Sequence, residues 1–512
     1  PATLSVIRDL VETGHSRLYD RLRQETPRGL VRLRGVSGLG PKRIRTLHER
    51  LGVETPEDLR AAVEAGRVGA LPGFGPATVR RIREGLAFVD RSAGRRRQPD
   101  AYATADRLIG HLEAAAPTIR EVRITGELRR RCETVDGVDL LAVTERAAEA
   151  LDAFLSTPGL GPTERVDEHR ARATLADGAP VRFRVVPPAA AGAARVVETG
   201  SGAHVEALTE RAAERGYRLD GTGLWDGDTL LDAADEEAVY AALDLPWIPP
   251  ELREGRGEVA AAEAGHLPRL VDYDDLRGTF HCHTTWSDGR ATVAEMAEAA
   301  AGRGWRYLGI ADHSVSAGYA GGLTVEEVRR QHQEIDAWNA GRGGEVRVLK
   351  GVEADILRDG RLDYDDETLS TFDYVVGSVH SSFRMDEAEM TARITAAVRN
   401  PHLSILGHAT GRLLLTREPY PLDVDAVLDA AAEAGSAVEI NGDPHRLDLD
   451  WRHWPSAKDR GVRCAINPDA HSVAGIGAVV YGVAMARKGW LEPEDVINTW
   501  ELERVESEFG IG

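Results

Sequence analysis

The feature that most constrains this chain is a series of apolar runs in residues 272–512, each of which ends at polar side chains. Seven such runs alternate with amphipathic segments, a pattern typical of βα units. The runs are Phe280 before His281, Tyr307–Ala311 before Asp312, Val346–Lys350 before Glu353, Tyr374–Val379 before His380, Leu403–Leu406 before His408, Ala437–Ile440 before Asn441, and Arg463–Ile466 before Asn467. Parallel strands of a βα barrel end at one rim, where catalytic side chains collect. The pattern therefore predicts a parallel sheet or barrel with polar residues gathered at one mouth.

Nine histidines and acids at these points are candidate metal ligands. His281 and His283 are two residues apart, so their side chains point the same way from a strand, and Cys282 points the other way. Neutral imidazoles together with carboxylates suit Zn²⁺, Mn²⁺ or Fe²⁺ better than Mg²⁺ alone. The nine candidates are His281, His283, Asp288, His313, Glu353, His380, His408, Asp469 and His471.

This set resembles the PHP (polymerase and histidinol phosphatase) domain, whose fold is a distorted seven-stranded barrel with a trinuclear metal centre. The resemblance covers about residues 272–500 and fills all nine ligand positions, while Thr279 replaces the Asp that many relatives carry before His-x-His. It implies three divalent ions (Zn²⁺, Mn²⁺ and/or Fe²⁺) and Glu353 as a bridge between two of them. It also implies that Glu353, His313 and Asp469 are catalytic and that a metal-activated water attacks phosphorus in line.

Two arginines near the expected rim are candidates to clamp a substrate phosphate. They are Arg384, four residues after His380, and Arg412, four residues after His408. Each is equally compatible with a structural salt bridge. His402 and His445 fall outside the motif positions, and we interpret them as surface or outer residues.

The first 98 residues contain a repeated Gly-x-Gly-Pro turn, at Gly38–Pro41 and at Gly73–Pro76. Each turn opens a predicted helix, so free backbone N–H groups at the helix start form a phosphate cradle. The repeat resembles the helix-hairpin-helix motif, which holds the DNA backbone without reading sequence; ordinary Gly-Pro helix connections are the alternative. The candidate DNA-binding residues are Gly38, Gly40, Lys42, Arg43, Gly73, Gly75, Arg80 and Arg81. Residues 1–3 repeat residues 76–78, so we expect the chain to begin inside a third, truncated hairpin.

Residues 125–140 resemble the nucleotidyltransferase signature of family X DNA polymerases, which places Asp-x-Asp on a strand. Three substitutions disable it: Gly137 stands for the first Asp, Arg182 for the third Asp, and Glu127 for the phosphate-binding Ser. Asp139 and the two signature arginines, Arg129 and Arg130, remain. One carboxylate beside a cation cannot build a two-metal site. Asp136 could substitute for the lost Asp, but a one-residue slip points a strand side chain to the opposite face.

We therefore expect the middle segment to keep an α+β nucleotidyltransferase-like fold as a spacer or a DNA-positioning platform, with an unrelated α+β domain as the alternative. Its predicted strands include 121–124, 138–143 and 181–186. The predicted division of the chain is 1–98 for the helical head, 99–248 for the middle domain, 249–271 for a linker and 272–512 for the barrel.

Charge is distributed unevenly over the 512 residues. The net charge is −20, which argues against a general nucleic-acid binder, yet the first 97 residues hold 20 basic and 11 acidic residues. A basic head on an acidic body favours an anionic partner at the head, although a solvated charged face is the alternative. Three scattered cysteines fit a reducing cytoplasm, and no apolar run is long enough for a membrane span.

The order of hairpins, nucleotidyltransferase and PHP domain resembles bacterial family X polymerases over nearly the whole chain. The resemblance implies a metal-dependent DNA phosphoesterase in repair: a 3′→5′ exonuclease, with apurinic endonuclease or 3′-phosphatase activity as further candidates. The alternatives are an active gap-filling polymerase with a proofreading PHP domain, a small-molecule phosphatase, and a non-catalytic DNA-binding adaptor. The expected partner is DNA, held through its backbone, with no membrane; we expect a nucleoid-associated monomer in the cytoplasm.

Overall fold

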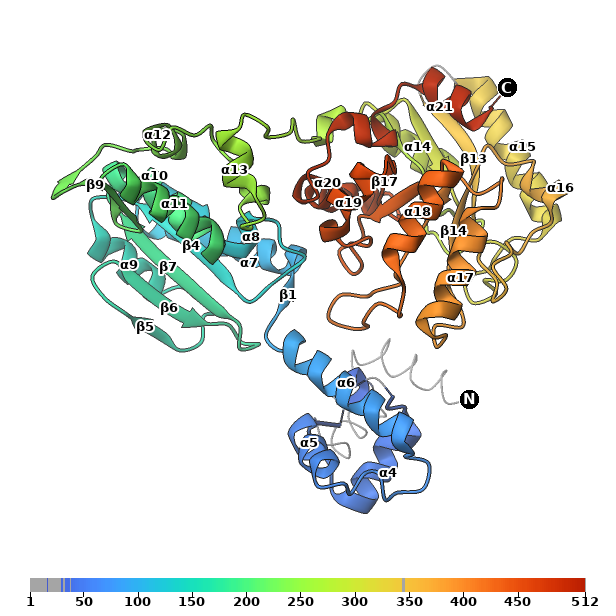
Figure 1. Ribbon diagram of the computed structural model, residues 1–512, viewed down its shortest axis with the longest axis horizontal. Helices are drawn as coiled ribbons and strands as arrows, with labels where there is room; N and C mark the ends of the chain where they lie inside the picture. The colour runs from blue at the N-terminus through green and yellow to red at the C-terminus, as the bar shows by residue number, and fades with distance from the viewer. Residues whose placement is uncertain (1–15, 17–28, 31–32, 37, 343–345, 512) are drawn as a thin grey trace. The chain divides into compact units, whose positions relative to one another are not determined.

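The computed structural model describes residues 16, 29–30, 33–36, 38–342 and 346–511 of the 512 (Figure 1). The chain divides after Arg95 into two compact units, and the short stretch Leu415–Glu418 is counted with the first. The expected truncated hairpin at residues 1–12 lies outside the described residues. Within the described part, no helix is both long enough and apolar enough to cross a membrane.

The head consists of short helices around a small apolar core. Its elements are η1 (Leu33–Gly35), α4 (Pro41–Leu51), α5 (Pro56–Glu64) and α6 (Pro76–Ser92). Leu47, Leu59, Phe74 and Ile82 are buried together at its centre. The two helices predicted to follow the Gly-x-Gly-Pro turns are therefore present.

The two turns have the same backbone geometry. Gly38 and Gly73, the first glycine of each turn, have φ of +87° and +85°, which side chains with a Cβ rarely adopt. Gly40 and Gly75 are the N-caps of α4 and α6, and neither helix start is capped by a side chain. The repeat seen in the sequence is therefore a repeat in three dimensions, with two equivalent helix starts.

The middle domain begins with a five-stranded sheet in the order β2-β4-β7-β6-β5, in which only β4 and β7 are parallel. The elements of this first part are β1 (Arg96–Arg97), α7 (Gln98–Ala115), β2 (Glu121–Ile124), α8 (Gly126–Arg129), β3 (Thr134–Val135), β4 (Val138–Val143), α9 (Ala147–Leu155), β5 (Thr163–Arg165), β6 (Arg170–Thr174) and β7 (Pro180–Val186). The three strands predicted here are present almost to the residue. Alternate apolar residues of these strands, such as Leu140 and Phe183, pack against α7 and α9.

A smaller subdomain follows, with its own core. Its elements are η2 (Pro188–Ala190), α10 (Ala191–Thr199), α11 (Gly202–Glu214), β8 (Tyr217–Asp220), β9 (Gly223–Asp226), β10 (Thr229–Leu230), α12 (Glu236–Ala242), η3 (Pro250–Leu252) and α13 (Glu258–Glu263). Within residues 249–271, the predicted linker, Leu252 and Ala262 are buried in the same core as Leu208 and Tyr240.

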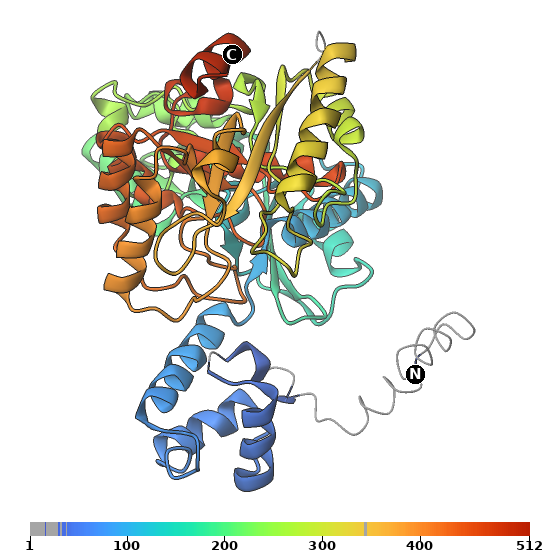
Figure 2. The ribbon, with the colours of Figure 1, turned by 90° about the vertical axis from the view of Figure 1, so that its right-hand side faces the viewer.

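The C-terminal domain is a parallel seven-stranded sheet in simple order, β11 to β17. Its strands are β11 (Gly278–Thr279), β12 (Tyr307–Ile310), β13 (Arg347–Asp355), β14 (Tyr374–Ser378), β15 (Ile405–Leu406), β16 (Ala437–Asn441) and β17 (Cys464–Asn467). Its helices are η4 (Tyr273–Asp275), α14 (Val293–Ala301), α15 (Val325–Arg342), α16 (Asp366–Leu369), α17 (Glu387–Val398), α18 (Val424–Ala434), η5 (Trp451–His453), α19 (Trp454–Asp459), η6 (Ala474–Ala478), α20 (Val479–Lys488), η7 (Pro493–Asp495), η8 (Ile497–Thr499) and α21 (Leu502–Phe509). Strand β13 and helix α15, which packs against it, are drawn in yellow tones in Figure 2.

The first and last strands approach each other and nearly close the sheet into a barrel. Just beyond β11 and β17, Cys282 and Ala470 form a parallel bridge, and the His283 amide donates to the Ala470 carbonyl at 2.8 Å. The barrel interior below this rim is filled by buried aromatic and aliphatic side chains, among them Phe280, Tyr307 and Tyr374. The predicted fold class, a helical head, a polymerase-like α+β middle and a distorted seven-stranded barrel, is confirmed.

Candidate metal centre

The nine candidate ligands meet at one end of the barrel, around the carboxylate of Glu353. Its Oε1 lies 3.0 Å from His408 Nε2, 3.3 Å from His380 Nε2 and 3.5 Å from His281 Nε2. Its Oε2 lies 2.9 Å from His313 Nδ1 and 3.7 Å from His283 Nε2. The two oxygens of one buried carboxylate therefore face two different sets of imidazoles.

The other two carboxylates, Asp469 and Asp288, join the same cluster by facing histidines of the same set. Asp469 Oδ1 lies 3.2 Å from His283 Nε2 and 3.7 Å from His281 Nε2. Asp288 Oδ1 lies 3.2 Å from His471 Nε2 and 3.7 Å from His313 Nε2. Residues from strand ends far apart in the sequence thus form a continuous set of ligand atoms.

The buried ring nitrogens of these histidines fit a metal site. His281 Nε2, both ring nitrogens of His283, His313 Nδ1 and His408 Nδ1 are buried without a hydrogen-bond partner. A buried polar atom without a hydrogen bond is energetically costly. Five such ring nitrogens in one place therefore fit a bound metal ion. Three overlapping groups have their ligand atoms within 4.8 Å of one another: His283/Asp288/His313/His471, His281/His283/Glu353 and His313/Glu353/His380. The donor set suits divalent metal ions.

Carboxylates behind the cluster fix the orientation of two rings. Glu439 Oε2 lies 2.7 Å from His281 Nδ1, and Asp355 Oδ1 lies 2.5 Å from His380 Nδ1, so in both rings Nε2 faces Glu353. Such outer carboxylates hold the tautomer of a metal-binding histidine. Neither Glu439 nor Asp355 was among the site residues predicted from the sequence. Glu439 gave a signal, because a carboxylate inside the apolar run 437–440 needs a buried partner.

Electrostatics keep the central acid charged. Burial alone would raise the pKa of Glu353, but the neighbouring His380, His281 and His313 hold that pKa well below its ordinary range. The prediction that its strand ends at Lys350 is wrong: β13 continues to Asp355, because its second half pairs with β14. Glu353 is thus held by a strand on the inner wall of the barrel, more rigidly than a loop would hold it.

A cation that the sequence did not reveal also lies at the mouth. Arg446 Nε is 3.6 Å from Asp469 Oδ2, and its side chain is mostly buried. Residue 446 belongs to the segment between β16 and η5, and it was not singled out because Asn441 at the end of that strand is not one of the nine candidate ligands.

Arg412, a candidate phosphate clamp, is largely buried and has several partners. Its guanidinium donates to Asp450 Oδ2 at 2.7 Å, to the Arg446 carbonyl at 3.0 Å and to the Leu447 carbonyl. Glu133 of the middle domain completes the arrangement, with Oε1 2.9 Å from Arg452 Nη1 and 3.8 Å from Arg412 Nη2. These contacts favour the structural salt bridge over the phosphate contact, and they join the middle domain to the segment that carries Arg446.

Arg384 has a different environment. It is exposed and lines a cavity of about 310 Å³ together with Arg358, Ser382, Phe383 and Met385. Its assignment as a phosphate clamp remains a prediction.

The polymerase-like site of the middle domain contains an ion-pair cluster. Arg182 Nη1 lies 2.8 Å from Asp139 Oδ1, and Arg182 Nη2 lies 2.7 Å from Asp136 Oδ2. The expectation that Asp136 points to the opposite face is wrong, because β4 begins only at Val138 and the strand alternation does not extend back to residue 136. Burial raises the pKa of Asp139, and the ion pair with Arg182 opposes this rise.

The other residues of this degenerate signature have structural partners. Arg129 forms a two-pronged ion pair with Glu236 (2.7 and 2.6 Å), and Arg130 donates to Glu254 and to the Thr199 carbonyl. Glu127 accepts the Asp136 amide at 2.9 Å. A Cβ at position 137 would lie 2.2 Å from the Pro180 carbonyl oxygen, so Gly137 permits a close approach of two backbones.

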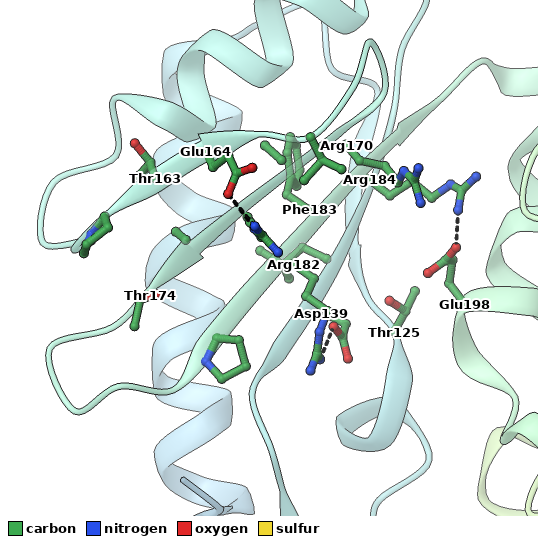
Figure 3. Close-up of a pocket in the computed structure, with 17 residues that line it drawn as sticks. Thr125, Asp139, Thr163, Glu164, Arg170, Thr174, Arg182, Phe183, Arg184 and Glu198 are labelled. Carbon is green, nitrogen blue, oxygen red and sulfur yellow. Dashed lines mark hydrogen bonds and ion pairs between the residues drawn. The ribbon is translucent and has the colours of Figure 1, made fainter.

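A pocket of about 720 Å³ lies on the open face of this sheet (Figure 3). Four arginines from neighbouring strands line it as cross-strand pairs, Arg170 opposite Arg184 and Arg172 opposite Arg182. Like charges so placed repel each other, and each arginine has an acidic partner. Arg170 pairs with Asp167 and Arg184 with Glu198. Arg172 pairs with Glu164, and Arg182 pairs with both Asp136 and Asp139.

The candidate DNA-binding residues of the head fall into two groups. Lys42, the second residue of α4, and Arg80, the fifth residue of α6, are both exposed. Arg43 instead donates to the Gly38 carbonyl at 2.9 Å, and the Arg81 side chain lies over Gly38. Gly40, Gly73 and Gly75 lie at the two turns described above.

Three known families match the chain, in the order that the sequence predicts. They are a SAM-like helix-hairpin-helix tandem over residues 30–87, the DNA polymerase beta thumb over residues 194–254, and the PHP domain over residues 279–441. With a relative that matches nearly end to end, this architecture shows that the chain belongs to the family X DNA polymerases that carry a C-terminal PHP domain.

That relative is the DNA polymerase/3′-5′ exonuclease PolX of Bacillus subtilis, which is 37% identical over 513 residues, covering 99% of this chain and 89% of the relative. Two relatives match a smaller part of the chain. A probable phosphatase of Caldanaerobacter subterraneus subsp. tengcongensis is 30% identical over 237 residues, which cover 43% of this chain and 85% of that protein. A probable phosphatase of Thermoanaerobacter sp. is 29% identical over 240 residues, covering 43% and 89%.

Proposed function

We propose that this protein is a metal-dependent DNA phosphodiesterase that removes nucleotides from 3′ ends, in DNA repair, and that its polymerase core is inactive. The observation that carries the proposal is the cluster of nine candidate ligands, Glu353 and eight others, in which five buried ring nitrogens make no hydrogen bond. The family supports a DNA substrate, and the basic, uncapped helix starts of the head offer contacts to its backbone.

Three divalent cations fit the three overlapping ligand groups, with Zn²⁺, Mn²⁺ or Fe²⁺ as the expected ions. Such ions supply Lewis-acid activation of water and neutralise charge on the phosphate. Glu353 would link two groups of ligands, because its two oxygens face different histidines. Asp469 and His313 lie at the same mouth. Arg446, beside Asp469, and the exposed Arg384 are the candidate cations for the substrate phosphate, and Arg412 supports the segment of Arg446 by donating to its carbonyl.

The test is incubation of 5′-labelled single-stranded and gapped DNA with Mn²⁺. A ladder of products shortened from the 3′ end is expected. A gel shift without shortening would instead support an adaptor, and hydrolysis of small phosphate esters alone would support a small-molecule phosphatase. Oligonucleotides with a 3′-phosphate or an internal abasic site assay the 3′-phosphatase and apurinic endonuclease activities on the same gels.

We predict no primer extension on gapped DNA with nucleotides and Mg²⁺ or Mn²⁺, in the wild-type protein or in Gly137→Asp. Arg182 engages both nearby carboxylates, and an Asp side chain at 137 would meet the Pro180 carbonyl, so restoring the lost residue cannot restore the two-metal geometry. Denaturing gels measure extension, with an active family X polymerase as the positive control. Extension that is lost in Asp139→Ala would contradict the proposed inactivity.

The double substitution Lys42→Ala/Arg80→Ala should weaken DNA binding and reduce the slope of log affinity against log salt by about 2, because each phosphate contact contributes about 1. Deletion of residues 1–95 should flatten the slope further. Fluorescence anisotropy with labelled DNA at several salt concentrations measures both effects. Arg50→Ala, at the other end of α4, is the matched control and should leave the slope unchanged; an unchanged slope in the double variant would remove the head as a backbone-binding element.

The remaining assignments follow from this function. We propose that the protein acts as a monomer on chromosomal DNA in the cytoplasm, associated with the nucleoid. We propose the division at residues 98, 248 and 271, with 249–271 linking the middle domain to the barrel; Leu252 and Ala262 of this segment pack in the core of the preceding subdomain.

A further inference from the structure

An exposed aromatic ring lies at the mouth of the metal centre. Tyr319 is 72% exposed, more than any other large apolar side chain in the described part of the chain. Its ring centroid lies 6.0 Å from the His313 ring and 6.2 Å from the His380 ring, both candidate ligands, and it meets both edge to face. One side of the ring is therefore supported by the metal centre, and the rest faces solvent.

The loop that carries Tyr319 is held in place by hydrogen bonds from both of its ends. Ser314 and Leu323 form a parallel bridge, and the Leu323 amide donates to the His313 carbonyl at 2.9 Å. Within the loop, the amides of Ala320 and Gly322 donate to the Ala317 carbonyl. These hydrogen bonds fix the backbone of the loop, and the loop backbone in turn places Tyr319 at the mouth.

Two further contacts anchor the loop to the barrel. The Ser316 amide and the Ser314 hydroxyl both donate to Asp363 Oδ2 at 2.8 Å. A Cβ at position 322 would lie 1.8 Å from the Ser314 carbonyl oxygen, so only glycine permits this close turn. A rigid aromatic residue loses little conformational freedom when a ligand packs on it.

We propose that Tyr319 is a specificity-determining residue that stacks on the nucleobase of the 3′-terminal nucleotide while its phosphodiester lies over the metal centre. The inference rests on the proposed exonuclease function and names the substrate group that this side of the mouth contacts. A nucleobase is the planar group that lies one sugar away from the phosphate under attack. Aromatic side chains at single-strand sites stack on any base, because every base presents a π-face, so little base preference follows.

The first test observes stacking without turnover. Single-stranded DNA with 2-aminopurine at its 3′ end is bound to the protein in Ca²⁺ and, separately, in chelator, and fluorescence is read at saturating protein. Stacking quenches this base, so quenching is expected in wild type and Tyr319→Phe and is expected to be lost in Tyr319→Ala at equal DNA saturation. An absence of quenching in wild type, or equal quenching in Tyr319→Ala, would overturn the proposal.

The second test separates the base contact from a general effect on the loop. With Mn²⁺, Tyr319→Ala should lower kcat/KM about 5- to 100-fold on an ordinary 3′ end, chiefly through KM, and Tyr319→Phe should restore it. On an oligonucleotide whose 3′-terminal nucleotide lacks a base, wild type and Tyr319→Ala should differ by less than about 2-fold. Val315→Ala changes another exposed residue of the same loop and is the matched control.

The two tests together distinguish a failure of the exonuclease proposal from a failure of the stacking proposal. If the wild-type protein quenches 2-aminopurine but degrades no DNA, the exonuclease proposal fails and the base contact stands. If it degrades DNA and Tyr319→Ala loses activity equally on ordinary and abasic ends, the loop supports the metal centre and the stacking proposal fails.

Discussion

Glu353→Gln is expected to lower Mn²⁺-dependent DNA degradation roughly 10³-fold. The substitution keeps the shape of the side chain but removes the charge that faces five imidazoles through two oxygens. An amide offers one oxygen and one NH₂ group, so it cannot hold ligand sets on both sides. Initial rates on 5′-labelled single-stranded DNA measure the loss, and metal analysis of the purified variant should show a lower content of bound ions.

The matched control is Glu367→Gln, an exposed acid in the first turn of α16, which should leave the rate unchanged. A chelator should abolish the wild-type activity, and added Mn²⁺ should restore it. Fluorescence anisotropy should give the same DNA affinity for Glu353→Gln and for the wild type, because the substitution does not alter the head that is proposed to hold the DNA backbone. A variant that keeps at least half of the wild-type rate would show that Glu353 is not central to the reaction.

Glu236→Gln should destabilise the middle domain by about 3–5 kcal/mol, because it leaves two arginines without their counter-charge in a buried site. Glu236 accepts two-pronged ion pairs from Arg129 and from Arg253, and Arg253 is completely buried. Hydrogen exchange of peptides from α12 and η3 measures the effect locally, which suits a protein with several folding units. Glu237→Gln, the exposed neighbour in the same helix turn, is the control and should cost less than about 1 kcal/mol.

The same site predicts the direction of a pH effect. Burial raises the pKa of Glu236, but Arg253 and Arg129 lower it to about 2 overall, from 4.5 in the unfolded chain. The folded state thus holds this proton less tightly, so the stabilisation is fully present above about pH 4.5 and disappears as the pH falls towards 2. Glu236→Gln should remove this part of the acid dependence, and an unchanged acid profile would contradict the assigned ion pairs.

Much of the metal centre could be predicted from the sequence because strand ends are visible as the points where apolar runs stop. In a parallel barrel these ends must share one rim, so His281, His380 and Asp469 could be placed together without coordinates. The polymerase-like strands were equally clear, since alternate apolar residues mark β4 and β7.

The parts that could not be predicted depend on contacts between segments. Glu439 lies inside a strand, and its burial is explained by partners from other segments, namely His281, the His408 amide and Asn467. The side on which Asp136 lies depends on where β4 begins, and the extension of β13 depends on its pairing with β14. Arg446 and Tyr319 lie on segments after the strands, where no periodic pattern determines position.

Glu133 gives the middle domain a role in the barrel that does not depend on any reaction of its own. It is the acid from outside the barrel that meets the paired guanidiniums of Arg412 and Arg452, next to the segment that carries Arg446. Without Glu133, Arg412 and Arg452 would have Asp450 as their one shared acid among the ion pairs of the described residues. The fold of the middle domain therefore contributes a counter-charge beside the segment that carries Arg446, whatever chemistry the middle domain itself performs.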